Sequence, residues 1–449
     1  MRYAPEDVAN AISGIRGKLA WPSNDALQQE FDAGLHPNFL AYEKIRPSGS
    51  SLPMLEKYLI GATSFLHQPS NYYDVFGACR CVKLLQALNS ALNVLLKSSV
   101  SGLENRLRRL KNETRHDAFD AAILEFVVAG HHANRDEVAY LEFVQESPGK
   151  KTADLLVVTK QIHSLVECKK IDRTQDYTLT IRIAAAGLLN EVLNQLRAEN
   201  ISAVIDVVFH HDPRDIKSSA FVGRCLQAAR GEISIANSEF TVTGTHLPRY
   251  HSDDFTLYPS AKFFWDRYRY RTRSDWIGLV HKIAPKLARR IDLPVKLRGG
   301  RSSWLADVEW DAAAKWRITS EEILAKYRRF AFSNIFKGIE QIEGGGPNSS
   351  VHMWLETDYY IAGRKDALGD LFKRLVAKSS EFGWIIINET LLDVSPRGFF
   401  DMIEHAHIIR GPKGRTSDAP VTLLFTSKTS PTIAEFGVGH RLPDIDESM

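Results

Sequence analysis

The fold of this chain is most readable in two short stretches: Lys151-Thr152-Ala153-Asp154-Leu155-Leu156 and, soon after it, Leu165-Val166-Glu167-Cys168-Lys169. Their aliphatic character predicts β-strands over residues 154–159 and 163–171. Because side chains alternate along a strand, Leu165, Glu167 and Lys169 share one face, with Glu167 and Lys169 about 7 Å apart. A metal ligand and an amine that directs a water molecule can therefore lie together on this strand.

The register between the two strands adds a second carboxylate. If they form a hairpin that turns at Lys160 and Gln161, Asp154 lies directly opposite Glu167. Opposed carboxylates are roughly 4.5–5.5 Å apart at Cβ and repel each other unless a positive charge lies between them. Oxygen ligands favour Mg²⁺ or Mn²⁺, and such an ion polarises a phosphate and activates a water molecule. The alternative is a surface hairpin in which Glu167 and Lys169 form only a salt bridge.

A third carboxylate, Glu125, lies on a predicted helix over residues 118–129. Its neighbours three and four positions away are all small or apolar: Ala121, Ala122, Val128 and Ala129. A buried carboxylate needs a proton, a cation or several hydrogen-bond donors. We therefore expect the metal site or Lys169 to satisfy Glu125.

These elements resemble those of the PD-(D/E)xK nuclease superfamily, which has the restriction-endonuclease-like fold. In that superfamily a helix with a Glu precedes a three-stranded meander, an Asp begins the second strand, and an E-x-K triplet lies on the third. A helix and another strand follow. The matching positions here are Glu125, Asp154 and Glu167-Cys168-Lys169, and Ala153 stands where the motif name has Pro. Strands over 138–146 and 201–209 and a helix over 181–199 would complete the αβββαβ core.

The resemblance implies a role for each matched residue. Asp154 and Glu167 would bind Mg²⁺ or Mn²⁺ together with the carbonyl of Cys168. Lys169 would orient or deprotonate the attacking water, and Glu125 would support the water shell of the metal. The implied activity is that of a metal-dependent endonuclease or exonuclease.

The remaining sequence predicts an α/β protein with domains on either side of this core. We expect an N-terminal helical domain (1–112), a nuclease-like domain (113–260), a basic segment (261–343) and a C-terminal α/β domain (344–449). The Gly- and Ser-rich stretch at 344–350 is the best candidate linker. The N-terminal helices are a candidate surface for a homodimer or a partner protein.

A basic segment over residues 262–301 holds twelve Lys or Arg against three Asp, a net charge of +9, interleaved with aromatic residues. This composition is typical of a surface that contacts phosphates and stacks on bases. The candidate nucleic-acid contacts are Arg267, Arg269, Arg271, Arg273, Arg289 and Arg290. A second basic edge is predicted at Arg106, Arg108, Arg109 and Lys111. The alternative is that these charges are solvated or pair with acidic residues of a neighbouring domain.

The overall composition excludes several classes of protein. With 44% hydrophobic and 25% charged residues, the 449-residue chain can bury sizeable cores and is not mainly disordered. Its four cysteines form no C-x-x-C pair, which argues against a structural zinc site or a disulfide framework. The sequence contains neither a long apolar run nor a signal-like N-terminus, so we expect a cytoplasmic protein with no membrane partner. Adjacent histidines such as His131-His132 are expected to be structural.

Together these features predict a metal-dependent nuclease that hydrolyses DNA, with RNA as an alternative substrate and bacterial, antiviral defence as its context. The rival hypothesis is a catalytically inactive nuclease-like module that binds nucleic acid or a partner protein. The intact acidic pair and lysine argue against that rival. A third hypothesis, a helical scaffold with an incidental hairpin, predicts that Glu125, Asp154, Glu167 and Lys169 do not converge.

Overall fold

The chain divides into two compact units. The structure, a computed structural model, describes residues 5–23, 53–67, 75–145, 152–159, 162–171, 176–246, 276–283, 291–292, 303–304, 308–356, 382–394, 400–414, 424–425 and 432–435. Unit 1 comprises Met1–Asp172, Arg328–Leu392 and Phe400–Met449, and unit 2 comprises Arg173–Tyr327 and Asp393–Phe399. Most of unit 2 is thus inserted into unit 1, directly after the strand that carries Glu167.

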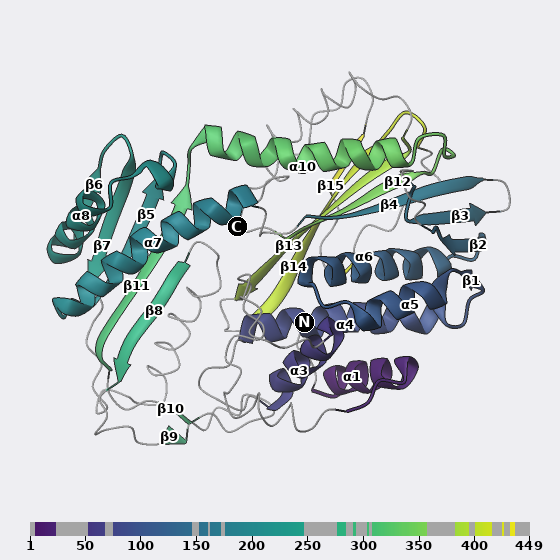
Figure 1. Cartoon of the computed structure of the whole chain (residues 1–449), viewed down its shortest axis with the longest axis horizontal. Helices are drawn as coiled ribbons and strands as arrows, with labels where there is room; N and C mark the ends of the chain where they lie inside the picture. The colour runs from purple at the N-terminus through teal and green to yellow at the C-terminus, as the bar shows by residue number, and fades with distance from the viewer. Residues whose placement is uncertain are drawn as a thin grey trace. The chain divides into compact units, whose positions relative to one another are not determined.

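Unit 1 is built on a mixed sheet whose eight described strands follow the order β1-β2-β3-β4-β12-β13-β14-β15. They are β1 (Val100–Ser101), β2 (Val138–Phe143), β3 (Leu155–Thr159), β4 (His163–Ile171), β12 (Ser350–Glu356), β13 (Trp384–Val394), β14 (Phe400–Arg410) and β15 (Thr432–Glu435). As predicted, β2, β3 and β4 form an antiparallel meander. Strand β12 is parallel to both β4 and β13. Figure 1 shows these distant segments of the chain lying side by side.

Helix α6 (His116–Ala133) covers one face of this sheet and contacts β2, β3 and β4. The N-terminal helices α1 (Pro5–Leu19), α3 (Met54–His67) and α4 (Val75–Leu95) pack together, and α4 packs on α6, with α5 (Leu103–Asn112) beside it. At the crossing of α4 and α6, a Cβ on Gly130 would lie 2.8 Å from Ala91 Cα, so glycine permits the close approach. The described residues of the predicted helical region (1–112) are mostly helical, and they belong to unit 1 together with the sheet.

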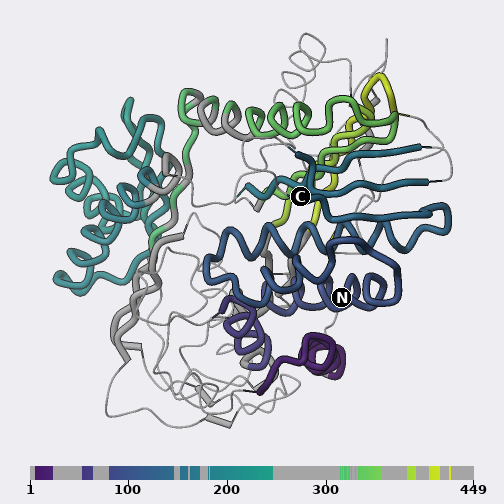
Figure 2. Tube along the Cα trace, turned by 45° about the vertical axis from the view of Figure 1, so that its right-hand side comes forward, coloured from purple at the N-terminus to yellow at the C-terminus, as the bar shows by residue number. Residues whose placement is uncertain are grey.

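Helix α10 (Glu321–Gln341) covers the opposite face of the sheet. Its residues Phe332, Ile335 and Ile339 share one apolar core with β12 and β13 residues, namely Val351, Met353, Leu355, Ile385 and Ile387. Figure 2 shows α6 and α10 on opposite sides of the strands, so unit 1 has three layers. On α10, a Cβ at Gly338 would lie 2.8 Å from a Val351 methyl carbon and 3.5 Å from Glu167 Cγ.

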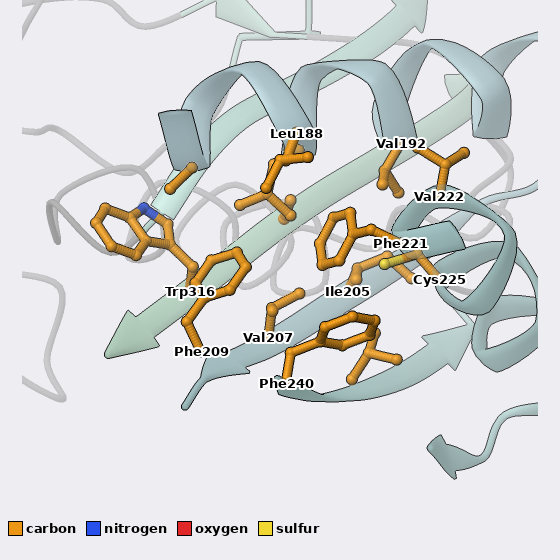
Figure 3. Packing of buried hydrophobic residues seen from close by; sticks show 14 of the residues in the cluster. Leu188, Val192, Ile205, Val207, Phe209, Phe221, Val222, Cys225, Phe240 and Trp316 are labelled. Carbon is orange, nitrogen blue, oxygen red and sulfur yellow. The ribbon is translucent and has the colours of Figure 1, made fainter. Parts of the chain in front are cut away.

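Unit 2 has a sheet of its own, whose described strands follow the order β6-β7-β5-β11-β8. They are β6 (Ser234–Ala236), β7 (Phe240–His246), β5 (Ala203–Phe209), β11 (Val308–Ile318) and β8 (Trp276–Ile283), and a separate short pair is formed by β9 (Ile291–Asp292) and β10 (Ser303–Trp304). Helices α7 (Asp176–Ala198) and α8 (Ser218–Gly231) pack on one face, and the 3-10 turn η1 (Pro213–Asp215) precedes α8. Figure 3 shows Leu188, Val192 and Phe221 pointing toward Ile205 and Val207 in this core.

Strand β5 corrects one prediction. The sequence placed it as the last strand of the nuclease-like core, but it pairs with β7 and β11 in unit 2, and β12 lies beside β4 instead. Its apolar run also predicted full burial on both faces, whereas only alternate residues are fully buried and Val204, Asp206 and Val208 are partly buried. The hydrophobic pattern of a strand predicts its burial, but it does not predict which strands pair with it.

The predicted linker at residues 344–350 is also corrected. This stretch is a tight turn inside unit 1 that joins α10 to β12: the Gly346 N–H donates to the His163 carbonyl at 2.9 Å, and the buried Ser349 hydroxyl accepts from the Leu165 N–H at 3.0 Å. Strands β12 to β15 consequently extend the sheet of unit 1, so residues 344–449 do not form a separate domain. The expected domain over 113–260 is split between the two units.

Within the described part of the chain, no helix is both long enough and apolar enough to cross a membrane.

Candidate metal centre

The hairpin formed by β3 and β4 has the register that the sequence predicted. Leu155 pairs with Val166 and Leu156 with Leu165, which puts Asp154, one residue before β3, opposite Glu167. The Asp154 N–H donates to the Val166 carbonyl at 3.1 Å, and Asp154 Oδ2 accepts from the Cys168 N–H at 2.8 Å. The side chain of Asp154 is therefore held at the edge of β4, beside Cys168.

Glu167 and Lys169 lie together on the face of β4 that α10 covers. Glu167 is buried, and its Oε1 forms an ion pair with Lys169 Nζ, whose side chain is 24% exposed. The other oxygen, Glu167 Oε2, is buried and accepts from no N–H or O–H group among the described residues; the Glu167 and Asp154 carboxyl groups lie close enough to share a proton when no cation separates them. An orphaned carboxylate oxygen opposite a second carboxylate is what a cation would satisfy.

The electrostatics of this pair are those of a buried carboxylate, Glu167, held beside a partly buried one, Asp154. Burial, and then the charge of Asp154, raise the pKa of Glu167 to about 8, although Lys169 acts in the opposite direction. Burial also raises the pKa of Asp154, opposed by the Cys168 N–H and by the charges of Lys169 and Arg106. A divalent cation between the two carboxylates would favour the ionised form of both groups.

Cys168 presents its backbone to the cluster, and its thiol is buried away from it. Its side chain is buried on the opposite face of β4, and burial, followed by the charges of Asp154, Glu125 and Glu167, raises the pKa of its thiol well above the ordinary value. Since the N–H of Cys168 points to the β3 edge, its carbonyl points the same way, past the beginning of β3 and beside Asp154. A carbonyl oxygen with two neighbouring carboxylates makes an all-oxygen ligand set.

The structure brings Glu125 to this cluster, but not with the predicted partner. Glu125 is buried on α6, and its Oε2 lies 3.0 Å from Arg106 Nη1. The sequence assigned its neutralisation to a metal or to Lys169, and it assigned Arg106 to an exposed basic edge; Arg106 is buried instead. Asp154, Glu167 and Lys169 lie together at the β3–β4 hairpin, and Glu125 is near enough for its charge to raise the pKa of the Cys168 thiol. Within the described residues, Glu125 does not join Asp154 and Glu167 in a group of three carboxylates that could hold a metal.

Arg106 is the residue of this site that sequence reasoning missed. It belongs to α5, whose buried residues are Leu103, Arg106 and Leu110. The spacing of three and four residues places Arg106 on the apolar face of the helix. The spacing alone would have predicted that Arg106 is buried, but the neighbouring basic residues favoured its assignment to a charged edge.

The ligand set fits a hard cation only in part. Two carboxylates and one carbonyl suit Mg²⁺, which commonly takes one or two carboxylates and keeps several waters. Among the residues that the structure describes, no group of three or more His, Cys, Asp or Glu side chains is arranged to hold a metal ion. A metal ion at this position would therefore have two carboxylate ligands at most from these residues, and backbone and water would have to supply the others.

The other predicted site residues are not brought into this cluster. Arg267, Arg269, Arg271, Arg273, Arg289 and Arg290 lie outside the described residues. The described part of the basic segment includes strand β8, which pairs antiparallel with β11 in the sheet of unit 2.

His132 of the His131-His132 pair lies inside unit 1. His132 is buried with His352 of β12 at a ring-centroid distance of 6.1 Å, and neither ring has a hydrogen-bond partner within the described residues.

Comparisons with protein-family models, with curated proteins and with solved structures each found no match. The description of the site therefore rests on the geometry of this chain alone.

Proposed function

We propose that this chain is a metal-dependent nuclease that hydrolyses phosphodiester bonds of DNA. The observation that carries the proposal is the juxtaposition of Asp154 and Glu167 on neighbouring strands, with the buried Oε2 of Glu167 unsatisfied within the described residues and Lys169 next to it. Asp154, Glu167 and the carbonyl of Cys168 would hold Mg²⁺ or Mn²⁺. Such an ion polarises a phosphate oxygen and lowers the pKa of a bound water.

The arrangement of unit 1 supports a restriction-endonuclease-like core of the PD-(D/E)xK kind. A helix with Glu125 precedes the β2-β3-β4 meander, and the required helix and strand are supplied by α10 and β12 rather than by α7 and β5. Unit 2 would then be an insertion between the third and fourth strands of the core. An insertion of this size separates the elements in sequence without changing their order in the sheet.

Each residue of the cluster has a defined task in this proposal. Asp154 and Glu167 would bind the cation and balance its charge, and the burial of Glu167 would limit competition from bulk water. Lys169 is partly exposed, so its amine can reach a water molecule beside Glu167 and orient it for in-line attack on phosphorus. Glu125 is close enough to influence Cys168 and would act through the water shell of the metal.

A second candidate is a catalytically inactive nuclease-like module that binds nucleic acid or a partner protein. One observation favours it: Glu125 is paired with Arg106, and Glu167 with Lys169, so two of the acidic groups already have cationic partners. This candidate predicts binding without cleavage.

Cleavage assays with the full chain test the proposal. Plasmid, linear duplex, single-stranded DNA and RNA are incubated with Mg²⁺ or Mn²⁺, with and without a chelator. We expect DNA cleavage that the chelator stops, no detectable cleavage by Asp154→Ala, and a loss of about 10²-fold or more in Lys169→Ala.

Asp136→Ala removes an exposed carboxylate on the loop before β2 and serves as the matched control, with an unchanged rate expected. Wild-type protein that binds DNA but cleaves none of the substrates would favour the inactive module. Cleavage by Asp154→Ala at the wild-type rate would refute the assigned site.

A further inference from the structure

Arg106 is a buried cation placed between three elements of unit 1. From α5 its Nη1 lies 3.0 Å from Glu125 Oε2 on α6, and its Nη2 donates to the carbonyl of Val144, just after β2, at 3.2 Å. Its guanidinium carbon lies 5.9 Å from the ring centroid of Phe143. The planar guanidinium, with several donors in fixed directions, can bond Glu125 and the Val144 carbonyl at the same time better than a lysine amine can.

Arg106 is also linked to the candidate metal ligands. The Val144 N–H donates to the carbonyl of Asp154 at 2.9 Å, and Asp154 in turn accepts from Cys168. The charge of Arg106 acts on Asp154 as well, favouring its ionised form. A short path of hydrogen bonds, from side chains and backbone, therefore runs from Arg106 through Val144 and Asp154 to the strand that carries Glu167.

We propose that Arg106 is a positioning residue that holds Glu125 and the Asp154 segment in place around the metal, an inference that rests on the proposed function. A buried carboxylate that loses its cationic partner either takes up a proton or moves to solvent. Without Arg106, Glu125 would no longer present a fixed, charged group to the water shell of the cation. Partners that orient metal ligands in this way influence metal affinity although they do not touch the metal.

The direction in which metal affinity changes when Arg106 is replaced distinguishes a positioning role from a purely electrostatic one. A nearby positive charge repels a divalent cation, so if Arg106 acted only through its charge, its removal would tighten metal binding. If Arg106 positions the site, its removal weakens binding. The two outcomes have opposite directions.

Mn²⁺ binding to the full-length chain, measured by electron paramagnetic resonance, tests this inference without requiring cleavage. We expect Arg106→Gln and Glu125→Gln each to weaken Mn²⁺ binding by about 10-fold or more. The double variant should bind no more weakly than either single variant, because the two side chains act as one unit. Arg108→Gln, which removes an exposed charge from the same helix, is the matched control and should bind like wild type.

Arg106→Lys keeps the charge and guards against a Gln variant that does not fold. A lysine amine cannot bond Glu125 and Val144 with the same planar geometry, so we expect weaker Mn²⁺ binding for this variant as well. Unchanged or tighter binding in folded Arg106→Gln or Arg106→Lys, with Mn²⁺ bound normally by wild type, overturns the positioning role alone. Wild-type protein that binds no Mn²⁺ overturns the proposed function, and the positioning role with it.

Discussion

Lys169 and Lys170 are neighbours on β4 with opposite surroundings. Lys169 points to the α10 face, is partly exposed and pairs with Glu167. The side chain of Lys170 is 2% exposed on the α6 face, where its Nζ lies 3.9 Å from Asp120 Oδ2 and 4.2 Å from the ring centroid of Trp354. Two identical side chains one residue apart therefore belong to two different kinds of charged cluster.

The α6 face shows how a buried charge is fully compensated. Asp120 of α6 has no exposed surface, pairs with Arg80 of α4 and accepts from the Tyr58 hydroxyl at 2.6 Å. The α10 face differs, because within the described residues Glu167 retains an oxygen without a partner. Burial alone does not mark a functional site; an incompletely compensated group at a partly open position does.

Removing the charge of Asp120 should have the largest effect on stability. Asp120→Asn keeps the shape but leaves Arg80 and Lys170 without their shared carboxylate, so we expect a loss of about 3–5 kcal/mol in the free energy of unfolding. Chemical denaturation followed by tryptophan fluorescence measures this loss. Because Asp120 contacts Arg80, Tyr58 and Lys170 rather than the carboxylates of β3 and β4, Mn²⁺ affinity of the folded variant should stay at the wild-type value.

Asp117→Asn, an exposed position one helical turn earlier, is the control and should change stability little. If Asp120→Asn had normal stability but weaker Mn²⁺ binding, the Asp120 cluster would not be the purely structural one that the comparison assumes.

His132, also in the interior of unit 1, should make the protein sensitive to acid. Burial, with smaller effects from Arg135 and His131, lowers the pKa of His132 from 6.5 to about 3. The unfolded chain then binds more protons than the folded one below pH 6.5, so stability falls as the pH drops from 6.5 toward 3. Halfway through this range the loss from His132 is about 2–3 kcal/mol.

His132→Phe preserves an aromatic contact with His352 and should flatten this part of the pH–stability curve in denaturation series between about pH 4.5 and pH 7. His163→Gln, at an exposed position, should leave the curve unchanged. An equally steep curve in His132→Phe would show that other groups cause the acid sensitivity.

The smallest expected effect is a loss of DNA affinity when arginines of the basic segment, far from β4 in the sequence, are replaced. Replacing Arg269, Arg271 and Arg273 with Ala should weaken DNA binding for all sequences alike. The slope of log affinity against log salt should flatten by about 0.9 for each phosphate that the variant no longer neutralises. Titrations at several salt concentrations, in an Asp154→Ala background that prevents cleavage, measure it.

The control for this triple variant is a melting curve. Lower thermal stability with an unchanged slope would mean that these arginines pair with acidic residues of the protein. A loss that depends on DNA sequence would instead indicate contacts with base edges.

Local sequence was enough to predict the inner part of the site. Asp154 and Glu167 face each other because a short hairpin permits few registers, and each register fixes which side chains share a face. The same local reasoning located α6 and placed Glu125 on its buried side. It also recognised that a carboxylate among alanines and valines needs a partner.

The partners that come from distant parts of the chain were settled by tertiary packing alone. Arg106 forms an ion pair with Glu125, β12 rather than β5 lies beside β4, and the Gly-rich stretch at 344–350 is a turn within unit 1. Parallel pairing gives no local signal, because any apolar strand satisfies the neighbouring strand's hydrogen bonds and the choice depends on how whole layers pack. For the same reason the sequence could not tell Lys169 from Lys170: alternation puts them on opposite faces, but only the packed helices decide that Lys170 is buried and Lys169 is partly exposed.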